Sequence, residues 1–398
     1  MINFEQSGEF KAIRYNDDIL TLPVYKIPLD QLIYNKYNGR IKSIVLSYEL
    51  GLSRKLNAQI PNDKSIIEAY LFDSAEHRNE KTLQSLKRYG QQEVGIVTAD
   101  MIIIDGNRRA SLLNKLHREG NGVDFFKAVI LPDSLADNEV EIIKLETNYQ
   151  MGVDNKVEYK PIEKYLRCRE LLIKFQISIN EVSDLMSEKP SRIQQWMDIL
   201  ALMDEYLEYL KSANVYTRLD KKEGHFVDLY NYLKKYEHGH FPREQLKIVY
   251  FDYIRLGIPV QRARIIGNPR GSQSLFSQPN LWDDFYSQHE HIKADFKEAV
   301  FNSLKDEHPE KSNEEIFVTL DDNFKEKLNT PLLSNLVDGE IKIKQLKEFN
   351  NKVRELKRIL NYIQKFKVEE IESSDEEVIN SLLKDISRVS LLKSEIIR

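Results

Sequence analysis

The sequence predicts an α+β protein in which a mixed α/β domain is followed by a mostly α-helical remainder. Apolar residues spaced three and four apart recur along the chain and dominate after Pro161, as expected of amphipathic helices. Short apolar runs of strand length fall before about residue 152, at Val24–Leu29, Val94–Val97, Met101–Ile104 and Phe125–Leu131. With 398 residues, 41% of them hydrophobic, the chain is long enough for two or three cores.

These patterns divide the chain into four parts. Residues 1–155 are expected to form the α/β domain, and residues 156–255 a helical domain. Residues 256–280 contain several Pro and Gly together with Arg262, Arg264 and Arg270, which favours a linker or an exposed basic loop. Residues 281–398 are expected to be a helical C-terminal domain.

Composition favours a cytoplasmic protein that does not enter a membrane. No apolar run approaches the ~20 residues that a bilayer span requires, and the N-terminal residues show no secretory signal. The single cysteine, Cys168, cannot form an internal disulfide, which suits a reducing compartment. The net charge of −5 gives no general electrostatic footprint for nucleic acid.

The C-terminal part contains a basic helix with an apolar seam. Residues 342–367 carry nine basic and two acidic side chains, which could form a solvated face or contact a partner. Apolar residues repeat at heptad spacing at Leu346, Phe349, Val353, Leu356, Leu360 and Ile363. The seam could pair two subunits or pack within its own domain, and we expect a homodimer.

Residues 178–202 predict a helix-turn-helix. Ser178 with Glu181 has the spacing of a capping box, a break follows at 187–190, and Ser191 with Gln194 is expected to cap a second helix. In that helix Arg192 is a candidate contact to DNA phosphates, and Gln194 and Gln195 to base edges. Because this region is slightly acidic, DNA contacts could instead come from Arg262 and Arg264 or from the basic helix.

The segment Ile102–Ala110 predicts a phosphate-binding turn. An apolar strand leads into Asp105-Gly106-Asn107-Arg108-Arg109, and a helix follows. A helix N-terminus binds anions, and guanidinium groups match phosphate oxygens. In the alternative interpretation, Asp105 caps the helix and the two arginines are surface charges.

Four segments in this order resemble the ParB family. The segment Ile27–Arg40 is similar to its opening strand and Asn- and Arg-containing loop, and Gly90 with Val94–Val97 to its base-contacting box. Gly106–Arg109 resembles the family's G-E-R-R motif, and Asn148–Gln150 its E-N-L-Q-R motif. The helix pair at 178–202 falls where the family has its helix-turn-helix.

The resemblance implies a fold related to sulfiredoxin that binds CTP or another NTP with Mg²⁺ and is coupled to double-stranded DNA. By this resemblance Arg40, Gly106, Asn107, Arg108, Arg109, Asn148 and Gln150 would form the nucleotide site. Asn148, with Asp105, would ligate the metal, since Mg²⁺ prefers oxygen ligands.

Departures from the family pattern leave two alternatives open. Asn107 and Thr147 stand where the family has Glu, and Met151 where it has Arg. The D-G-x-x-R pattern resembles a variant from DNA-modification and anti-phage systems, so Asp105 and Glu146 could be the catalytic carboxylates of an NTPase or metal-dependent nuclease. Alternatively, the domain could be a non-catalytic scaffold for protein interactions.

Overall fold

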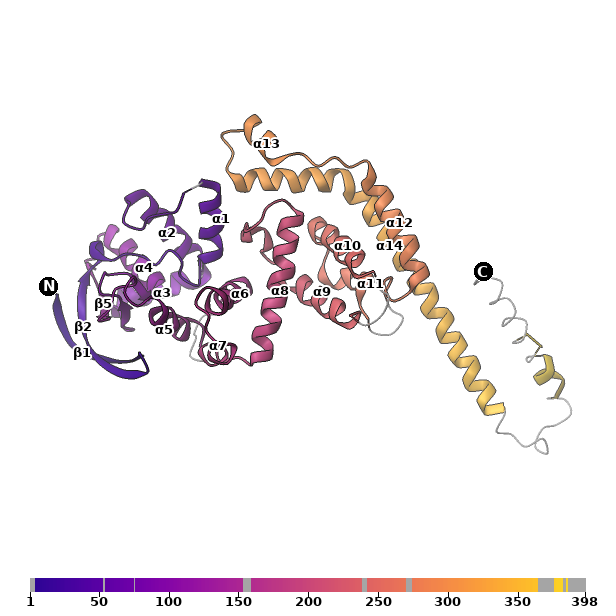
Figure 1. Ribbon diagram of the computed structural model, residues 1–398, viewed down its shortest axis with the longest axis horizontal. Coiled ribbons are helices and arrows are strands. Elements are labelled where there is room, and N and C mark those ends of the chain that lie inside the picture. The colour runs from indigo at the N-terminus through magenta and orange to yellow at the C-terminus, as the bar shows by residue number, and fades with distance from the viewer. Residues whose placement is uncertain are drawn as a thin grey trace. The chain divides into compact units, whose positions relative to one another are not determined.

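The computed structural model describes residues 4–52, 54–74, 76–152, 159–237, 242–269, 274–363, 376–381 and 384–385 (Figure 1). Their strands are β1 (Glu5–Tyr15), β2 (Asp18–Pro28), β3 (Gly95–Val97), β4 (Ile103–Asp105) and β5 (Phe125–Ile130). The helices of the first half are η1 (Leu29–Gln31), α1 (Lys42–Leu52), α2 (Pro61–Asp73), α3 (Glu76–Tyr89), α4 (Asn107–Arg118), α5 (Glu139–Met151), α6 (Pro161–Arg169), the π-helix η2 (Glu170–Lys174) and α7 (Ile179–Met186). Those of the second half are α8 (Pro190–Tyr209), η3 (Tyr216–Leu219), α9 (Glu223–Lys235), α10 (Arg243–Leu256), α11 (Val260–Gly267), α12 (Pro279–Ala294), α13 (Phe301–Glu307) and α14 (Asn313–Ile363). The predicted α+β class is confirmed.

The chain divides into two compact units. The first comprises Met1–Arg264 with Lys297–Lys327, and the second Ile265–Phe296 with Leu328–Arg398. The division within α14 falls just before Pro331, which lies inside that helix and cannot donate a backbone hydrogen bond. None of the described helices combines the length and the apolar character needed to cross a bilayer.

A five-stranded mixed sheet with the order β1-β2-β5-β3-β4 forms the N-terminal part of the first unit. β5 and β3 are parallel, while the other neighbours are antiparallel. Apolar residues of α2 and α4 pack on one face of the sheet, and those of α5 pack on the other. β4 is thereby buried on both sides, and the turn that follows it is held at a fixed position.

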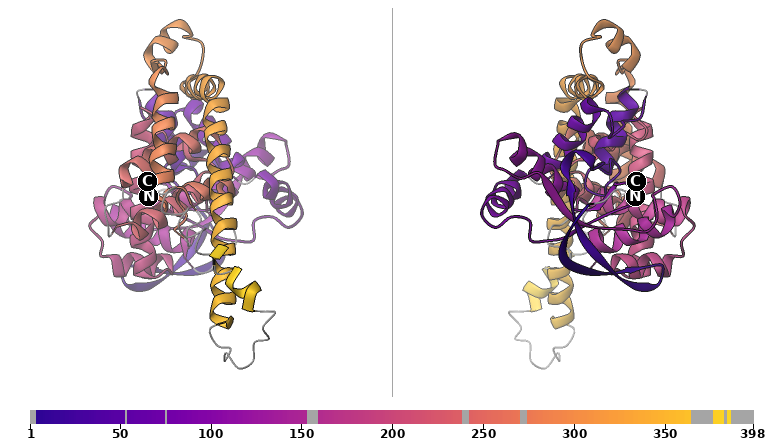
Figure 2. Two further views of the ribbon diagram at one scale, coloured as in Figure 1. Left: turned by 90° about the vertical axis from the view of Figure 1, so that its right-hand side faces the viewer. Right: turned by 90° about the vertical axis from the view of Figure 1, so that its left-hand side faces the viewer.

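The β1–β2 hairpin was not expected from the sequence, which predicted only the end of β2. It is long and curved (Figure 2) and pairs over almost its whole length. Its turn is formed by Asn16 and Asp17, both at positive φ, a conformation that Asn and Asp tolerate better than other residues. The Asn-Asp pair between two alternating segments was the available sequence signal.

Helices α6–α10, the first part of α11, α13 and the first part of α14 form the helical part of the first unit (Figure 1). The N-cap of α7 is Ser178, whose side chain accepts a hydrogen bond from the Glu181 amide, as predicted. The predicted Ser191 cap is wrong, because α8 begins at Pro190 with Lys189 as its N-cap. α8 also continues past Leu202 to Tyr209, because its buried apolar face continues. Within residues 256–280, where a linker or basic loop is expected, 260–267 form α11, and Arg270 lies outside the described residues.

The second unit is built on α12 and the C-terminal part of α14. Trp282 of α12 is buried and meets Phe276 edge to face at 4.7 Å. Asn335 donates from Nδ2 to the Phe285 carbonyl at 3.1 Å, which joins the two helices. Along the predicted seam Phe349 is 41% exposed, and the side chains of Leu360 and Ile363 lie outside the described residues. Pairing of two subunits along the seam remains a prediction.

A buried carboxylate joins the first helix of the α/β domain to the helical part. Glu163 of α6 accepts hydrogen bonds from the Ser43 amide at 3.1 and 3.2 Å and from the Ser43 hydroxyl at 2.5 Å. Burial raises the pKa of Glu163 from 4.5 to about 7, although Ser43 and Lys42 oppose the shift. The fold therefore favours the protonated acid.

We expect Glu163→Gln to remove a pH dependence of stability. The parent's Glu163 contributes stability that is complete below about pH 4.5 and is lost as the pH rises through about 7. The free energy of unfolding of the variant, relative to the parent, should rise between about pH 4.5 and pH 8, by up to about 3 kcal/mol. Denaturant titrations at several pH values measure this. The exposed Glu80→Gln is the control, and parallel curves for Glu163→Gln and the parent would contradict the expectation.

Candidate nucleotide-binding site

A cleft of about 920 Å³ in the first unit brings together most of the predicted site. Its lining includes Arg40 from the loop before α1, Asp105 at the end of β4, Arg108 and Arg109 in the first turn of α4, and Asn148 of α5. These residues come from three separate stretches of the sequence. The α/β core places them around one space.

Gly106 allows the chain to turn sharply from β4 into α4. Its φ of 101° lies in the left-handed region, and a Cβ atom there would come within 2.7 Å of the Phe126 ring. As the N-cap of α4, Gly106 has no side chain to cap the first amides of the helix. The residues on either side, Asp105, Arg108 and Arg109, line the cleft, so the N-terminal end of α4 lies beside it.

Arg108 lies in this cleft, and no acidic side chain forms an ion pair with it in the part of the chain that the structure describes. Its Nη1 atom is buried and has no hydrogen-bond partner among the described residues. Burial, together with the nearby charges of Arg40, Arg109 and Arg78, lowers the pKa of Arg108 to about 10. Crowded, desolvated guanidinium groups of this kind are stabilised by an anion between them.

Arg109 and Arg40 are held at the wall of the cleft by contacts with neighbouring groups. Arg109 donates from Nη1 to the Glu93 carbonyl at 2.8 Å. The Arg40 guanidinium lies over the Tyr159 ring at 4.2 Å, a contact that holds its direction. The acidic side chains of Glu141 and Glu181, which also line the cleft, both pair with Lys144, at 2.8 and 2.7 Å.

Residues that the sequence did not single out complete the wall. Lys11, Arg14 and Tyr15 of β1 line the cleft together with Tyr149 of α5. Lys11 donates to the Val94 carbonyl at 2.7 Å and lies over the Tyr149 ring at 5.0 Å. Burial lowers the pKa of Lys11, although Asp105 opposes the shift. These residues were missed because β1 was not recognised as a strand.

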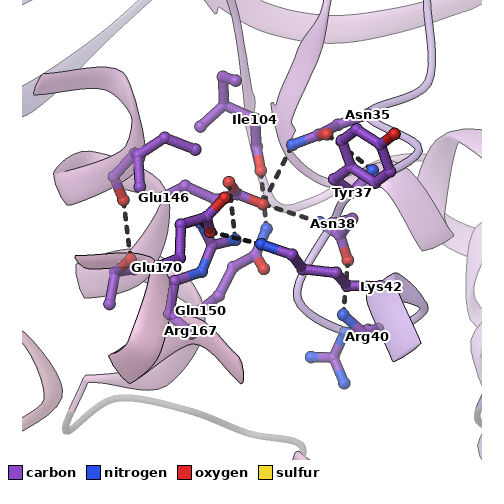
Figure 3. Close-up of polar contacts among 12 residues, drawn as sticks. Asn35, Tyr37, Asn38, Arg40, Lys42, Ile104, Glu146, Gln150, Arg167 and Glu170 are labelled. Carbon is purple, nitrogen blue, oxygen red and sulfur yellow. Dashed lines mark hydrogen bonds and ion pairs between the residues drawn. The ribbon is translucent and has the colours of Figure 1, made fainter. Parts of the chain in front are cut away.

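Asn107 and Gln150, expected in the nucleotide site, are turned to the interior and do not line the cleft. Asn107 accepts from the Asn35 amide at 2.9 Å and donates to the Ile103 carbonyl at 2.8 Å. Gln150 donates to the Ile104 carbonyl at 2.9 Å (Figure 3). Both side chains hydrogen bond to the backbone of β4, and Asn107 also bonds to the Asn35 amide. They therefore stabilise the β4–α4 turn from the interior of the domain.

Glu146, a candidate catalytic carboxylate, is fully buried and does not line the cleft either (Figure 3). It accepts hydrogen bonds from Asn35 at 3.1 Å and Asn38 at 3.4 Å, and forms an ion pair with Arg167 at 3.0 Å. Burial alone would lower the pKa of Arg167, but Glu146 and Glu170 raise it, so the guanidinium stays charged. In this arrangement Glu146 is not placed to take a proton from a cleft ligand.

Asp105 and Asn148 are the oxygen-bearing side chains of the predicted metal site that line the cleft. No cluster of three or more His, Cys, Asp or Glu residues that could hold a metal ion occurs in the part of the chain that the structure describes. The donor set fits Mg²⁺, which commonly takes one carboxylate, phosphate oxygens and water rather than an all-protein cage.

The candidate DNA contacts fall on two different helices. Arg192 and Gln195 line a shallow surface pocket of about 610 Å³ at the start of α8 and hydrogen bond to each other at 2.8 Å. Gln194 is exposed and donates to Asp198 at 2.9 Å. Arg262 and Arg264 belong to α11, where Arg264 pairs with Asp228 at 2.9 Å. The structure therefore groups Arg192 and Gln195, but not the two arginines of α11, at the α7–α8 turn.

Comparison with known proteins gives matches among solved structures. No protein-family model matches the sequence, and no curated protein does. Two matching structures are of the C-terminally truncated chromosome-partitioning protein ParB from Caulobacter crescentus. The one complexed to the centromeric parS site is 17% identical, with 46% of this chain and 85% of that chain covered and a TM-score of 0.29. The one complexed with CTP-gamma-S is 19% identical, with 52% and 92% covered and a TM-score of 0.19. Both are ParB structures, the family that the sequence motifs resemble.

We expect Gly106→Ala to destabilise the fold more than a matched substitution at Gly120. Both glycines have positive φ, but nothing lies within 4 Å of a Cβ at Gly120, whereas Phe126 blocks one at Gly106. Gly120→Ala should cost about 1–2 kcal/mol from its backbone conformation alone, and Gly106→Ala about 1–3 kcal/mol more from overpacking. Urea unfolding monitored by circular dichroism measures both. Equal losses would show that the β4–α4 turn has room for a side chain.

Proposed function

We propose that this chain is a ParB-like, nucleotide-regulated DNA-binding protein of the cytoplasm. Its cleft would hold the phosphates of CTP or another NTP with Mg²⁺, and its α7–α8 helix pair would contact double-stranded DNA. The observation that carries the proposal is the buried Nη1 atom of Arg108, which has no hydrogen-bond partner among the residues described, in a cleft also lined by Arg40 and Arg109. A buried cation without a partner is costly, and a phosphate group supplies the missing acceptor.

The cleft supports a polyphosphate better than a single carboxylate. Arg40 and Arg108 come from different elements, and an anion with several oxygens can contact both together with the first amides of α4. Asp105 and Asn148 on the same wall provide oxygen ligands for the accompanying cation. In the proposed switch, binding of the nucleotide would bias how the α/β domain packs on the helical part, in a homodimer joined through the C-terminal seam.

We expect Arg108→Ala to weaken nucleotide binding without unfolding the protein. Loss of charge-assisted hydrogen bonds worth about 1.5–3 kcal/mol raises Kd roughly 10- to 150-fold. Calorimetry against CTP, ATP, GTP and UTP with Mg²⁺, each with and without mixed double-stranded DNA, measures this. Stability should be unchanged or raised, because an uncompensated buried charge is removed.

Arg88→Ala is the matched control, since Arg88 is an exposed arginine on α3 of the same domain. It should leave every Kd unchanged. If Arg108→Ala binds each nucleotide as tightly as the parent, the cleft is not the phosphate site. If the parent binds no nucleotide under any condition, the scaffold alternative replaces the proposal.

A hydrolase is the second candidate function, and Asp105 is the observation that favours it. This carboxylate lines the cleft, and no hydrogen bond or ion pair of its side chain is found among the described residues. It therefore has free oxygen atoms for a metal ion or an attacking water. Glu146, the other candidate, is buried against Arg167.

Asp105→Asn separates binding from hydrolysis. If the chain is an NTPase or nuclease, this change should lower turnover by at least about 100-fold. Release of inorganic phosphate and nicking of DNA are the measurements, with Asp124→Asn, an exposed aspartate of the same domain, as control. Absence of turnover in the parent removes the hydrolase candidate and leaves binding.

A further inference from the structure

The polar network behind the cleft connects three parts of the first unit (Figure 3). Glu146 of α5 accepts from Asn35 and Asn38 on one side and pairs with Arg167 of α6 on the other. Arg167 uses its second terminal nitrogen to bind Glu170 at 3.0 Å. Glu170 in turn pairs with Lys42, at the start of α1, at 2.6 Å.

One arm of this network ends at the cleft. Asn38 accepts from the Arg40 amide at 3.1 Å, so the side chain that Glu146 contacts also sets the backbone position of Arg40. The Asn35 amide donates to Asn107, the first residue of α4. The two asparagines held by Glu146 are thus bonded directly to Arg40 and to the start of the helix that carries Arg108.

The other arm ends at the helix pair. Arg167 lies on α6, between two residues that contact α7 and α8. Tyr165 meets Trp196 of α8 with 5.7 Å between ring centroids. Cys168 packs its sulfur 3.1 Å from that of Met186, the last residue of α7. A displacement of α6 therefore acts on both helices of the pair.

Burial prevents this network from relaxing through water. Glu146 is fully buried, and Arg167 is 1% exposed. A carboxylate in this position cannot exchange a protein partner for solvent, because an unpaired buried charge is strongly unfavourable. If Arg40 and the start of α4 move toward a ligand, Asn35 and Asn38 move with them. A shift of the Glu146 side chain that follows these asparagines then moves Arg167, its ion-pair partner on α6.

We propose that the Glu146–Arg167 pair couples occupancy of the cleft to the position of α6 and, through it, to the α7–α8 pair. This inference rests on the proposed nucleotide binding. It assigns the regulation of DNA binding by the nucleotide to two positioning residues that would contact neither the nucleotide nor the DNA. A charge pair that joins two domains through a buried contact provides a physical link that both sites can bias.

Hydrogen exchange with and without CTP and Mg²⁺ tests the coupling. In the parent, saturating CTP should slow exchange in peptides covering residues 35–40 and 106–109 and also in those covering α6–α8, the latter by about fivefold or more. Because Arg167→Met alone leaves a buried charge and can prevent folding, the informative variant is Glu146→Gln/Arg167→Met. The glutamine keeps an acceptor for Asn35 and Asn38, and the methionine keeps most of the volume of the arginine side chain.

In the double variant we expect CTP affinity within about threefold of the parent, with protection retained at residues 35–40 and lost at α6–α8. The matched control is Arg243→Met, since Arg243 is an exposed arginine at the start of α10 and takes no part in the contacts described for Glu146 and Arg167. This control should keep the response of α6–α8. Retention of that response in the double variant, or its absence in a parent that binds CTP, overturns the coupling alone. A parent that binds none of CTP, ATP, GTP or UTP by calorimetry overturns the proposed function and the coupling together.

Discussion

Burial raises the pKa of the Glu146 carboxyl, and the ion pair with Arg167 on a helix of the neighbouring domain opposes that shift. The α/β domain is therefore electrostatically incomplete by itself, since its central acidic residue depends on Arg167. The remaining hydrogen bonds of Glu146 go to the loop that leads to Arg40. This ion pair therefore links the loop that leads to the cleft with α6, beside the Glu163–Ser43 and Glu170–Lys42 contacts that also join α1 to the helical part.

The cleft gathers several arginines around Arg108, although acidic side chains such as Asp105, Glu141 and Asp184 line it as well. Arg40, Arg78 and Arg109 act together on Arg108, and burial strengthens their repulsion. Under the proposed function, an anion bound among these arginines would relieve the repulsion, so nucleotide binding would also raise the stability of the fold.

The sequence predicted the parts of the site that depend on local pattern. The strand, glycine and paired arginines predicted an anion-binding turn, and Arg40, Arg108, Arg109, Asp105 and Asn148 do line one cleft. It could not predict the direction of side chains whose partners are distant in the sequence. Asn107 and Gln150 turn inward because backbone carbonyls of β4 and its approach need donors. Glu146 was predicted to be a catalytic carboxylate because the sequence does not reveal its ion-pair partner, Arg167, which lies 21 residues away on another helix. β1 was missed because its outward side chains are polar and its pairing depends on a two-residue turn.

The β1–β2 hairpin gives the cleft a wall that the family motifs do not encode. Lys11, Arg14 and Tyr15 lie on β1, at the outer edge of the sheet, ahead of every segment that resembles ParB. Arg40, Arg108 and Arg109, by contrast, lie around the β4–α4 turn and the loop before α1. The two walls of the cleft therefore come from parts of the domain that are far apart in the sequence, and the cleft is complete only when the edge strand β1 is paired with the sheet.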